Sequence, residues 1–133
     1  MKVSDSYLTG YHVLLVEDNA MNVMVAKKYM ANWGAQCTLA KNGQEALDWY
    51  DDETMDVILM DLQMPVLDGY QASKMLRERG ITVPIIALTA DATEDIKVKE
   101  FGIDDFVIKP YHPDQLFQKI KSHLPGKPKS SSQ

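Results

Sequence analysis

The chain has 133 residues, of which 45% are hydrophobic and 25% charged, and 14 basic against 19 acidic side chains give a net charge of −5. This length and mixture predict one globular domain and exclude a disordered chain. The negative charge disfavours binding to nucleic acid or to anionic membranes, whose phosphates attract basic surfaces. No apolar run approaches the roughly 20 residues of a membrane helix, and residues 1–10 lack the apolar core of a secretory signal. The single cysteine, Cys37, is typical of a cytoplasmic protein without disulfides.

Short apolar runs alternate with longer segments of helical spacing along the chain. Strands are predicted at 12–16, 36–40, 56–60, 84–88 and 105–108. Helices are predicted at 19–33, from 42 onward, at 68–80, at 92–101 and at 113–124. The strands are continuously apolar, which is typical of a parallel sheet covered on both faces. Five strand–helix units in alternation therefore predict an α/β fold with helices on both faces of the sheet, and right-handed crossovers leave few arrangements, chiefly doubly wound ones. Among these we expect the flavodoxin-like strand order 2-1-3-4-5.

Cap residues and apolar faces support the predicted helices. Asn42 and Asp68 each stand three residues before a Glu or Gln, a pattern typical of a helix start. The side chains expected to face the core are, in the first helix, Met21, Val25, Tyr29 and Trp33, with Ala26 and Met30 widening the stripe, and, in the third, Ala72, Met75 and Leu76. The segment 92–101 has only a weak apolar face, which indicates a loosely held helix.

The two ends of the chain differ in character from the part between them. Residues 1–10 are polar, and residues 125–133 are polar and contain proline, glycine, lysine and serine. We therefore expect an N-terminal tail at 1–10, the folded domain at 11–124 and a disordered C-terminal tail at 125–133.

Polar or charged side chains end four of the five predicted strands. They are Glu17 with Asp18, Asp61, Thr89 and Lys109. In a parallel doubly wound sheet these strand ends meet at one edge, and the three carboxylates flank the point where strand order reverses. Each residue alone is more often a helix cap, a turn hydroxyl or a solvated charge. Their joint placement favours a binding site.

The charges of this cluster indicate a bound cation. Three carboxylates repel one another, Lys109 offsets one charge, and a divalent cation would offset the other two. Oxygen ligands favour Mg²⁺, and the three histidines show no spacing typical of a zinc site. A carboxylate beside Mg²⁺, a lysine and a hydroxyl suits the acceptance of a phosphoryl group. No phosphate-binding glycine loop is present, so the phosphoryl group must come from a donor.

Four motifs resemble the receiver domain of two-component response regulators. They are Val-Glu-Asp-Asn at 16–19, Met-Asp-Leu-Gln-Met-Pro-Val-Leu-Asp-Gly at 60–69, Ala-Leu-Thr-Ala at 87–90 and Ile-Lys-Pro at 108–110. The resemblance covers about residues 11–124. The segments 17–22 and 42–46 are similar to receivers fused to hybrid sensor histidine kinases, which indicates the C-terminal receiver of such a kinase.

The resemblance implies a role for each site residue. Asp61 would be the phosphoacceptor, and it would bind Mg²⁺ directly together with Asp18. Glu17 would act through water, and the backbone carbonyl of Gln63 would complete the protein ligands. Lys109 would contact the phosphoryl oxygens.

The resemblance also implies a switch. Thr89 would move to the phosphoryl group and Phe106 would turn inward with it, while Gln63 and Asp91 would tune hydrolysis. The Lys109–Pro110 peptide bond is expected to permit a cis form. The segment 92–101, the strand 105–108 and the last helix are expected to form the surface that responds.

The implied function is that of a phosphoacceptor module in a phosphorelay and not of an independent enzyme. The donor would be a phosphohistidine-bearing kinase or phosphotransfer domain. The output would be a downstream protein or another domain of the parent chain. We expect no contact of this domain with nucleic acid or membrane, and a cytoplasmic location.

Three alternatives remain open on the sequence. An aspartate-nucleophile phosphatase would need a second acid where Gln63 stands. A flavodoxin-type flavin carrier would need hydroxyls where Glu17 and Asp18 stand. A degenerate receiver used only for binding is disfavoured by the intact acidic set and lysine.

Overall fold

Five parallel strands form the central sheet of the computed structural model, which describes residues 8–64, 67–90, 99–126 and 128–129. The strand order is β2-β1-β3-β4-β5, as predicted. The strands are β1 His12–Val16, β2 Gln36–Ala40, β3 Val57–Asp61, β4 Ile85–Thr89 and β5 Asp105–Ile108. Two of them, β3 and β4, begin and end one residue later than predicted. Asp61 and Thr89 are therefore the last residues of their strands rather than the first residues after them.

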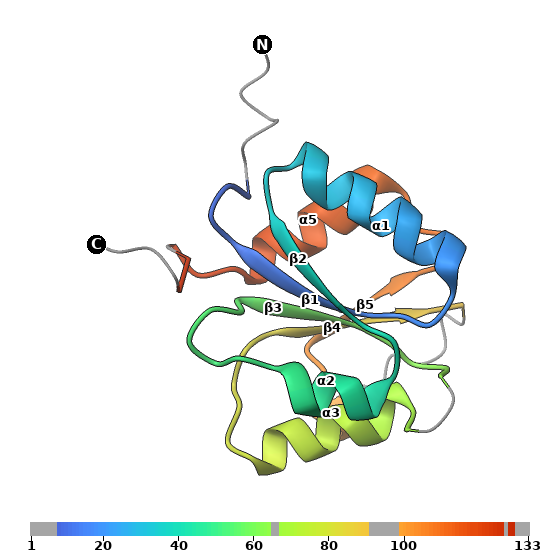
Figure 1. Cartoon of the computed structure of the whole chain (residues 1–133), viewed down its shortest axis with the longest axis vertical. Helices are drawn as coiled ribbons and strands as arrows, with labels where there is room; N and C mark the ends of the chain where they lie inside the picture. Colours follow the sequence, from blue (N-terminus) through green and yellow to red (C-terminus); the bar gives the residue numbers. More distant parts are fainter. Residues whose placement is uncertain (1–7, 65–66, 91–98, 127, 130–133) are drawn as a thin grey trace.

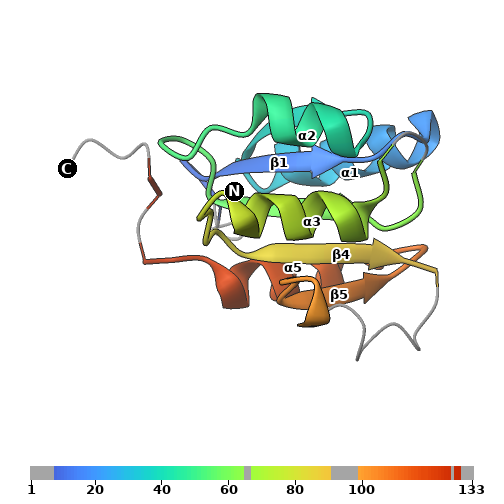
Figure 2. The ribbon, with the colours of Figure 1, turned by 90° about the horizontal axis from the view of Figure 1, so that it is seen from below.

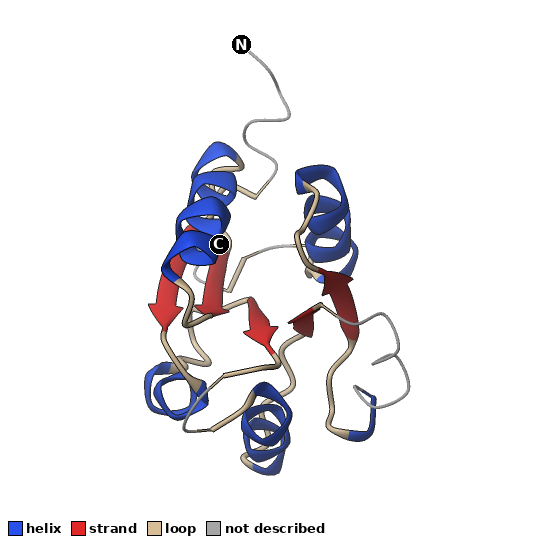
Figure 3. Cartoon of the chain, turned by 90° about the vertical axis from the view of Figure 1, so that its right-hand side faces the viewer, coloured by secondary structure: helices blue, strands red, loops and turns tan. Residues whose placement is uncertain are grey.

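Helices cover both faces of this sheet (Figures 1 and 3). The helices α1 Ala20–Asn32 and α5 Pro113–His123 lie on one face, and α2 Gly43–Trp49 and α3 Gly69–Glu78 lie on the other. Figure 2 shows α2 and α3 running along the sheet. Two apolar cores result, one between the sheet and each helix pair. Fully buried side chains such as Leu14 and Leu15 alternate between the two cores, which explains why the strand sequences are continuously apolar.

Side-chain caps begin three of the helices, and two of the capping residues, Asn42 and Asp68, were predicted. Asn19, Asn42 and Asp68 each accept a hydrogen bond from the backbone N–H three residues ahead, at 2.9–3.0 Å. In addition, Glu45 Oε1 accepts the N–H of Lys41 at 2.7 Å. Because each of these helices starts shortly after the carboxyl end of a strand, the caps fix the loops at the edge where the strands end.

The prediction that two side chains, Met21 and Met75, face the core is wrong. Met21 is 69% exposed and Met75 is 38% exposed, whereas Ala26 and Met30 are buried in α1, as predicted. Four residues rotate about 40° more than one full turn of an α-helix. Side chains spaced four apart therefore point in gradually different directions, and Met21, at one end of the series, points away from the core. The predicted helix at 92–101 lies mostly outside the described residues.

Packed contacts extend beyond the predicted range 11–124. Leu8 is fully buried, and its N–H donates to the carbonyl of Trp33 at 2.9 Å. After α5, the N–H of Lys129 donates to Asp56 Oδ1 at 2.8 Å. The domain boundaries themselves stay a prediction. Within the part of the chain that the structure describes, none of the helices has the length and apolar character needed to cross a membrane.

Candidate functional site

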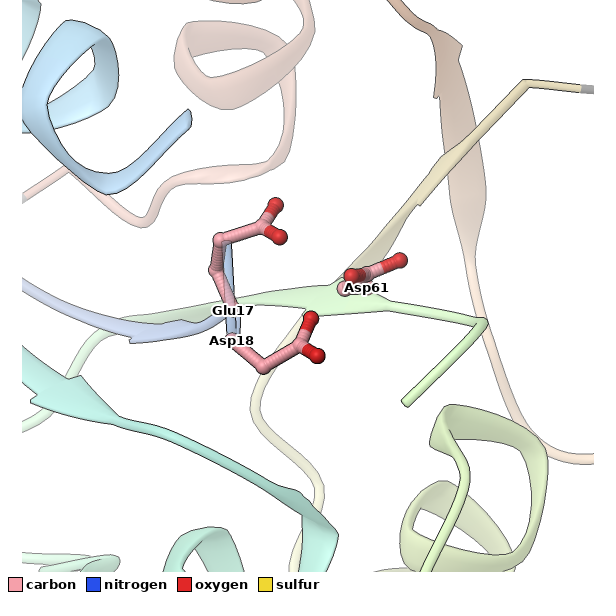
Figure 4. Close-up of side chains that lie close together, drawn as sticks. All are labelled: Glu17, Asp18 and Asp61. Atoms are coloured by element: carbon pink, nitrogen blue, oxygen red, sulfur yellow. The ribbon is translucent and has the colours of Figure 1, made fainter. Parts of the chain in front are cut away.

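Three carboxylates from two neighbouring strands gather at the carboxyl edge of the sheet. Val16 of β1 pairs with Met60 of β3, so the residues that follow, Glu17 and Asp61, stand at the same level. Each of Glu17, Asp18 and Asp61 has an oxygen within 4.8 Å of the others. Figure 4 shows the side chains of Glu17 and Asp18 extending from the end of β1 toward Asp61. The sequence analysis predicted this convergence, and the structure brings the three residues together.

Two of these carboxylates are buried, so their charges need a partner. Glu17 is 1% exposed and Asp61 is 4% exposed, whereas Asp18 is exposed. A buried carboxylate without a counter-charge is costly, because burial removes its hydration. The cluster therefore has one solvent-facing and two enclosed carboxylates.

Lys109 supplies a positive charge from the end of β5. Its Nζ lies 3.0 Å from Glu17 Oε1 and 3.3 Å from Asp61 Oδ1. The Lys109 N–H donates to the carbonyl of Thr89 at 2.7 Å, and the Lys109–Pro110 peptide bond is cis, as the sequence analysis expected. Three carboxylates and one ammonium group leave a formal charge of −2. A divalent cation would balance that charge.

The surroundings of Asp61 shift the pKa of its carboxyl group. Burial raises the pKa of its carboxyl group to about 6, and the nearby negative charge of Glu17 acts in the same direction. The backbone N–H of Gln63, which donates to Asp61 Oδ1 at 3.1 Å, and the charge of Lys109 oppose this rise. Since the carboxylate form would be disfavoured at this position, a bound cation would stabilise it.

The remaining predicted residues occupy different positions around the cluster. Gln63 has an exposed side chain, two residues after Asp61. Thr89 is 3% exposed at the end of β4. Phe106 is half-buried on β5 and packs against the core under α2 and α3. Asp91 lies outside the described residues, so its predicted role stays without a structural account.

Gly69 is a supporting residue that the sequence analysis missed. A side chain on it would collide with the Asp61 carbonyl oxygen and would approach Leu62 Cα and Met60 Cγ to 2.9 Å. The first turn of α3 therefore packs directly on the end of β3. The Asp-Gly pair at 68–69 is the signal that could have revealed this contact, since glycine often stands where one backbone approaches another.

The donor set fits a hard divalent cation. All three carboxylates offer oxygen, and the described residues place no histidine or cysteine in the cluster. Glu17 Oε1 is fully buried and, within the described part of the chain, accepts no hydrogen bond, although it forms the ion pair with Lys109. Three carboxylate groups within reach of one another, two of them buried, are the hard oxygen donors that Mg²⁺ prefers.

This fold, with its acidic cluster, ammonium group and hydroxyl at the strand ends, defines a phosphoacceptor domain. Residues 13–121 match the family described as "Response regulator receiver domain". The chain belongs to this family, which acts in two-component signalling. The assignment excludes the phosphatase and the flavin carrier.

Known relatives agree with the family and include hybrid kinases. The chain is 38% identical over 135 residues to hybrid signal transduction histidine kinase I of Dictyostelium discoideum, covering 93% of this chain and 8% of the relative. It is 42% identical over 113 residues to two-component system protein A of Emericella nidulans, covering 80% of this chain and 16% of the relative. The chain thus corresponds to a small part of these proteins.

Solved structures show the same fold. The receiver domain of a sensor histidine kinase from Pseudomonas aeruginosa, with a magnesium ion coordinated in its active site cleft, is 35% identical, with a TM-score of 0.78 over 86% of this chain and 98% of that one. A chain in the co-crystal structure of the Saccharomyces cerevisiae histidine phosphotransfer protein Ypd1 and the receiver domain of Ssk1 is 30% identical, with a TM-score of 0.79 over 93% of this chain and 99% of that one.

Proposed function

We propose that Asp61 is the residue that accepts the phosphoryl group and that Glu17, Asp18 and Asp61 hold Mg²⁺ beside it. The observation that carries this proposal is the position of Lys109 Nζ, 3.3 Å from Asp61 Oδ1, within a cluster of three carboxylates. Mg²⁺ would neutralise negative charge on the transferred group. Gln63, through its backbone carbonyl, is proposed as a further oxygen ligand.

The chain's own residues give Asp61 its reactivity. An Asp61 oxygen would form a bond to phosphorus while the P–N bond of a phosphohistidine breaks and its electron pair returns to the imidazole nitrogen. Lys109 would then stabilise the charge on the phosphoryl oxygens. The Gln63 N–H already binds Asp61 Oδ1 at 3.1 Å, which holds the carboxyl group in one orientation.

Thr89 and Phe106 are proposed to convert the modification into a structural change. Phosphorylation adds strong acceptor oxygens, toward which the Thr89 hydroxyl would move. Phe106 lies on β5, the strand beside β4, and is paired in register with Ala87 of β4. Its half-buried ring would turn inward as Thr89 moves, so that β5, α5 and the segment 92–101 present a new surface. Gln63 and Asp91 are proposed to tune the hydrolysis of the phosphoryl group.

The donor is proposed to be a phosphohistidine-bearing kinase or phosphotransfer domain. Met21 and Met24 support this proposal, because they are 69% and 68% exposed on α1, which begins two residues after Asp18. A donor that reaches Asp61 would bury these side chains. Met21→Glu should slow transfer from a histidine phosphotransfer protein without changing phosphorylation by acetyl phosphate. An equal loss with both donors would contradict the docking role.

The setting of the domain is also part of the proposal. It would be the C-terminal receiver of a hybrid histidine kinase, folded over about residues 11–124 and placed in the cytoplasm. Its output would be a downstream protein or another domain of the parent chain.

Phosphorylation at Asp61 can be tested directly. Incubation with acetyl phosphate and Mg²⁺ should add one acid-labile phosphoryl group to the wild-type protein, detected by intact mass, and none to Asp61→Asn. Asp68→Asn is the matched control, because Asn caps a helix as well as Asp and the exposed Asp68 should leave phosphorylation unchanged. Equal phosphorylation of Asp61→Asn and wild type would overturn the assignment.

A further inference from the structure

Tyr111 is a buried tyrosine close in the chain to Lys109. It follows Lys109 by two residues in the connection between β5 and α5. The residue is 7% exposed, and its ring belongs to the core under α1 and α5, together with Leu15 and Met30. Glu17, two residues after Leu15 in an extended chain, is directed toward the same face of the sheet. Tyr111 and Glu17 therefore approach the site from the same layer.

The Tyr111 hydroxyl has no hydrogen-bond partner in the described part of the chain, and its oxygen is fully buried. The negative charges of Glu17 and Asp61 raise the pKa of Tyr111, after the larger effect of burial, so the hydroxyl lies within the electric field of the cluster. An unpaired buried hydroxyl reduces stability, because it has lost its hydrogen bonds to water. A structural role in the metal-free protein therefore does not explain why a hydroxyl is present here.

Glu17 Oε1 complements this hydroxyl. It is a fully buried acceptor whose partner among the described residues is the ammonium group of Lys109, at 3.0 Å, and Tyr111 is a fully buried donor without a hydrogen-bond partner in the same residues. The only cation within reach of Glu17 in the described residues is Lys109, which Glu17 shares with Asp61. A divalent cation would take over part of the charge balance, and Mg²⁺ keeps several of its waters when it binds to protein carboxylates. Binding of the cation would therefore bring water molecules as polar partners for these buried groups. It would also change the charge balance around Glu17, which would allow the Glu17 side chain to reorient.

We propose that Tyr111 is a positioning residue of the metal site. Its hydroxyl donates a hydrogen bond to Glu17 when the site holds its divalent cation. The hydroxyl then fixes the orientation of Glu17, which in turn sets the affinity for the cation. The proposal concerns a residue that neither the acidic motif nor the lysine motif includes, and it rests on the metal site proposed above.

The variant Tyr111→Phe separates this role from a structural one. In the metal-free protein, removal of an unpaired hydroxyl should leave the melting temperature equal to or above that of wild type. The dissociation constant for Mg²⁺, measured by isothermal titration calorimetry, should rise by about three- to tenfold, the effect of losing one hydrogen bond. An unchanged dissociation constant, or a melting temperature clearly below that of wild type, would overturn the proposal.

Tyr11→Phe is the matched control, because the Tyr11 hydroxyl donates to the carbonyl of Pro125, outside the acidic cluster. This variant should lower the melting temperature and leave Mg²⁺ binding unchanged. If wild type itself fails to bind Mg²⁺, the metal site is wrong; equal binding by wild type and Tyr111→Phe contradicts only the role of Tyr111.

A second measurement needs no variant. In wild-type protein labelled with ¹³C at tyrosine Cζ, the Tyr111 signal should shift as Mg²⁺ is added, while that of Tyr11 should not. An unshifted Tyr111 signal at saturating Mg²⁺ would overturn the proposal even if the phenylalanine variant did not fold.

Discussion

Lys109 Nζ lies between two buried carboxylates, 3.3 Å from Asp61 Oδ1 and 3.0 Å from Glu17 Oε1. One ammonium group thus connects the ends of β1, β3 and β5. Because β3 and β5 are separated by β4, this contact holds together parts of the sheet that share no backbone hydrogen bonds. The same group offsets one of the three negative charges of the cluster and faces Asp61 Oδ1.

Lys109→Met should impair both stability and phosphorylation. Glu17, 1% exposed, would lose its counter-charge, which we expect to lower the free energy of unfolding by about 3 kcal/mol without Mg²⁺. Added Mg²⁺ should restore part of this loss. Phosphorylation by acetyl phosphate, followed by intact mass, should slow by about 100-fold.

Lys119→Met is the control for this prediction. Lys119 Nζ pairs with Asp105 Oδ1 at 2.8 Å on the partly exposed surface of α5, away from the acidic cluster. Its loss should cost no more than about 1 kcal/mol and should leave phosphorylation unchanged. A similar loss of rate in both variants would show that Lys109 has no special role.

The acidity of Asp61 predicts a pH dependence of stability. The pKa of this carboxyl group is about 6 in the folded protein, against 3.8 for an ordinary aspartate. The folded state therefore binds the proton more tightly than the unfolded state, and its stability falls as pH rises through this window. In EDTA, Asp61→Asn should be more stable than wild type by about 1–3 kcal/mol at pH 7, with the difference vanishing near pH 4.

Thermal unfolding of both proteins between pH 4 and pH 8 checks this prediction. Asp104→Asn, which changes a more exposed carboxylate, should not reproduce the pH-dependent gain. Mg²⁺ should also compete with the Asp61 proton, so its affinity should decline below pH 6. A stability difference independent of pH would contradict the raised pKa.

Local sequence pattern was sufficient to predict a doubly wound parallel sheet and the acidic cluster. Continuous apolar runs such as 12–16 identify parallel strands, and in a parallel sheet the residues after them must meet at one edge. The pattern could not show where remote segments touch. The contact of Gly69 with the Asp61 carbonyl and the hydrogen bond of Lys129 to Asp56 depend on the packed fold. Met21 was misplaced because spacing alone does not fix which face of a helix is inward.

Gly69→Ala should disturb the site through the backbone. The new methyl group would collide with the Asp61 carbonyl oxygen, so α3 or the end of β3 must shift. We expect a loss of about 1–3 kcal/mol in the free energy of unfolding and weaker Mg²⁺ binding. Gly126→Ala, where a methyl group meets nothing within 4 Å, should change neither quantity. Chemical denaturation and calorimetry measure both, and unchanged Mg²⁺ binding in Gly69→Ala would remove Gly69 from the site.

Removal of residues 125–133 tests the predicted domain boundary. Asp56 is 1% exposed, and its carboxylate accepts the N–H groups of His12 and Lys129, each at 2.8 Å. The truncated chain loses the second bond, so its free energy of unfolding should fall by about 1–2 kcal/mol while Mg²⁺ binding stays unchanged. A truncated chain as stable as the full one would place the end of the domain at 124.

Thr89→Ala should separate phosphorylation from its structural consequence. Thr89 supplies none of the three carboxylates of the cluster, so acetyl phosphate should still modify Asp61. Hydrogen exchange in the wild type should change over β5 and α5 on phosphorylation if, as proposed, the Thr89 hydroxyl and the ring of Phe106 move together. In Thr89→Ala that change should be absent or much smaller. Thr89→Ser, which keeps the hydroxyl, should retain it, and an unchanged response in Thr89→Ala would show that the signal leaves Asp61 by another route.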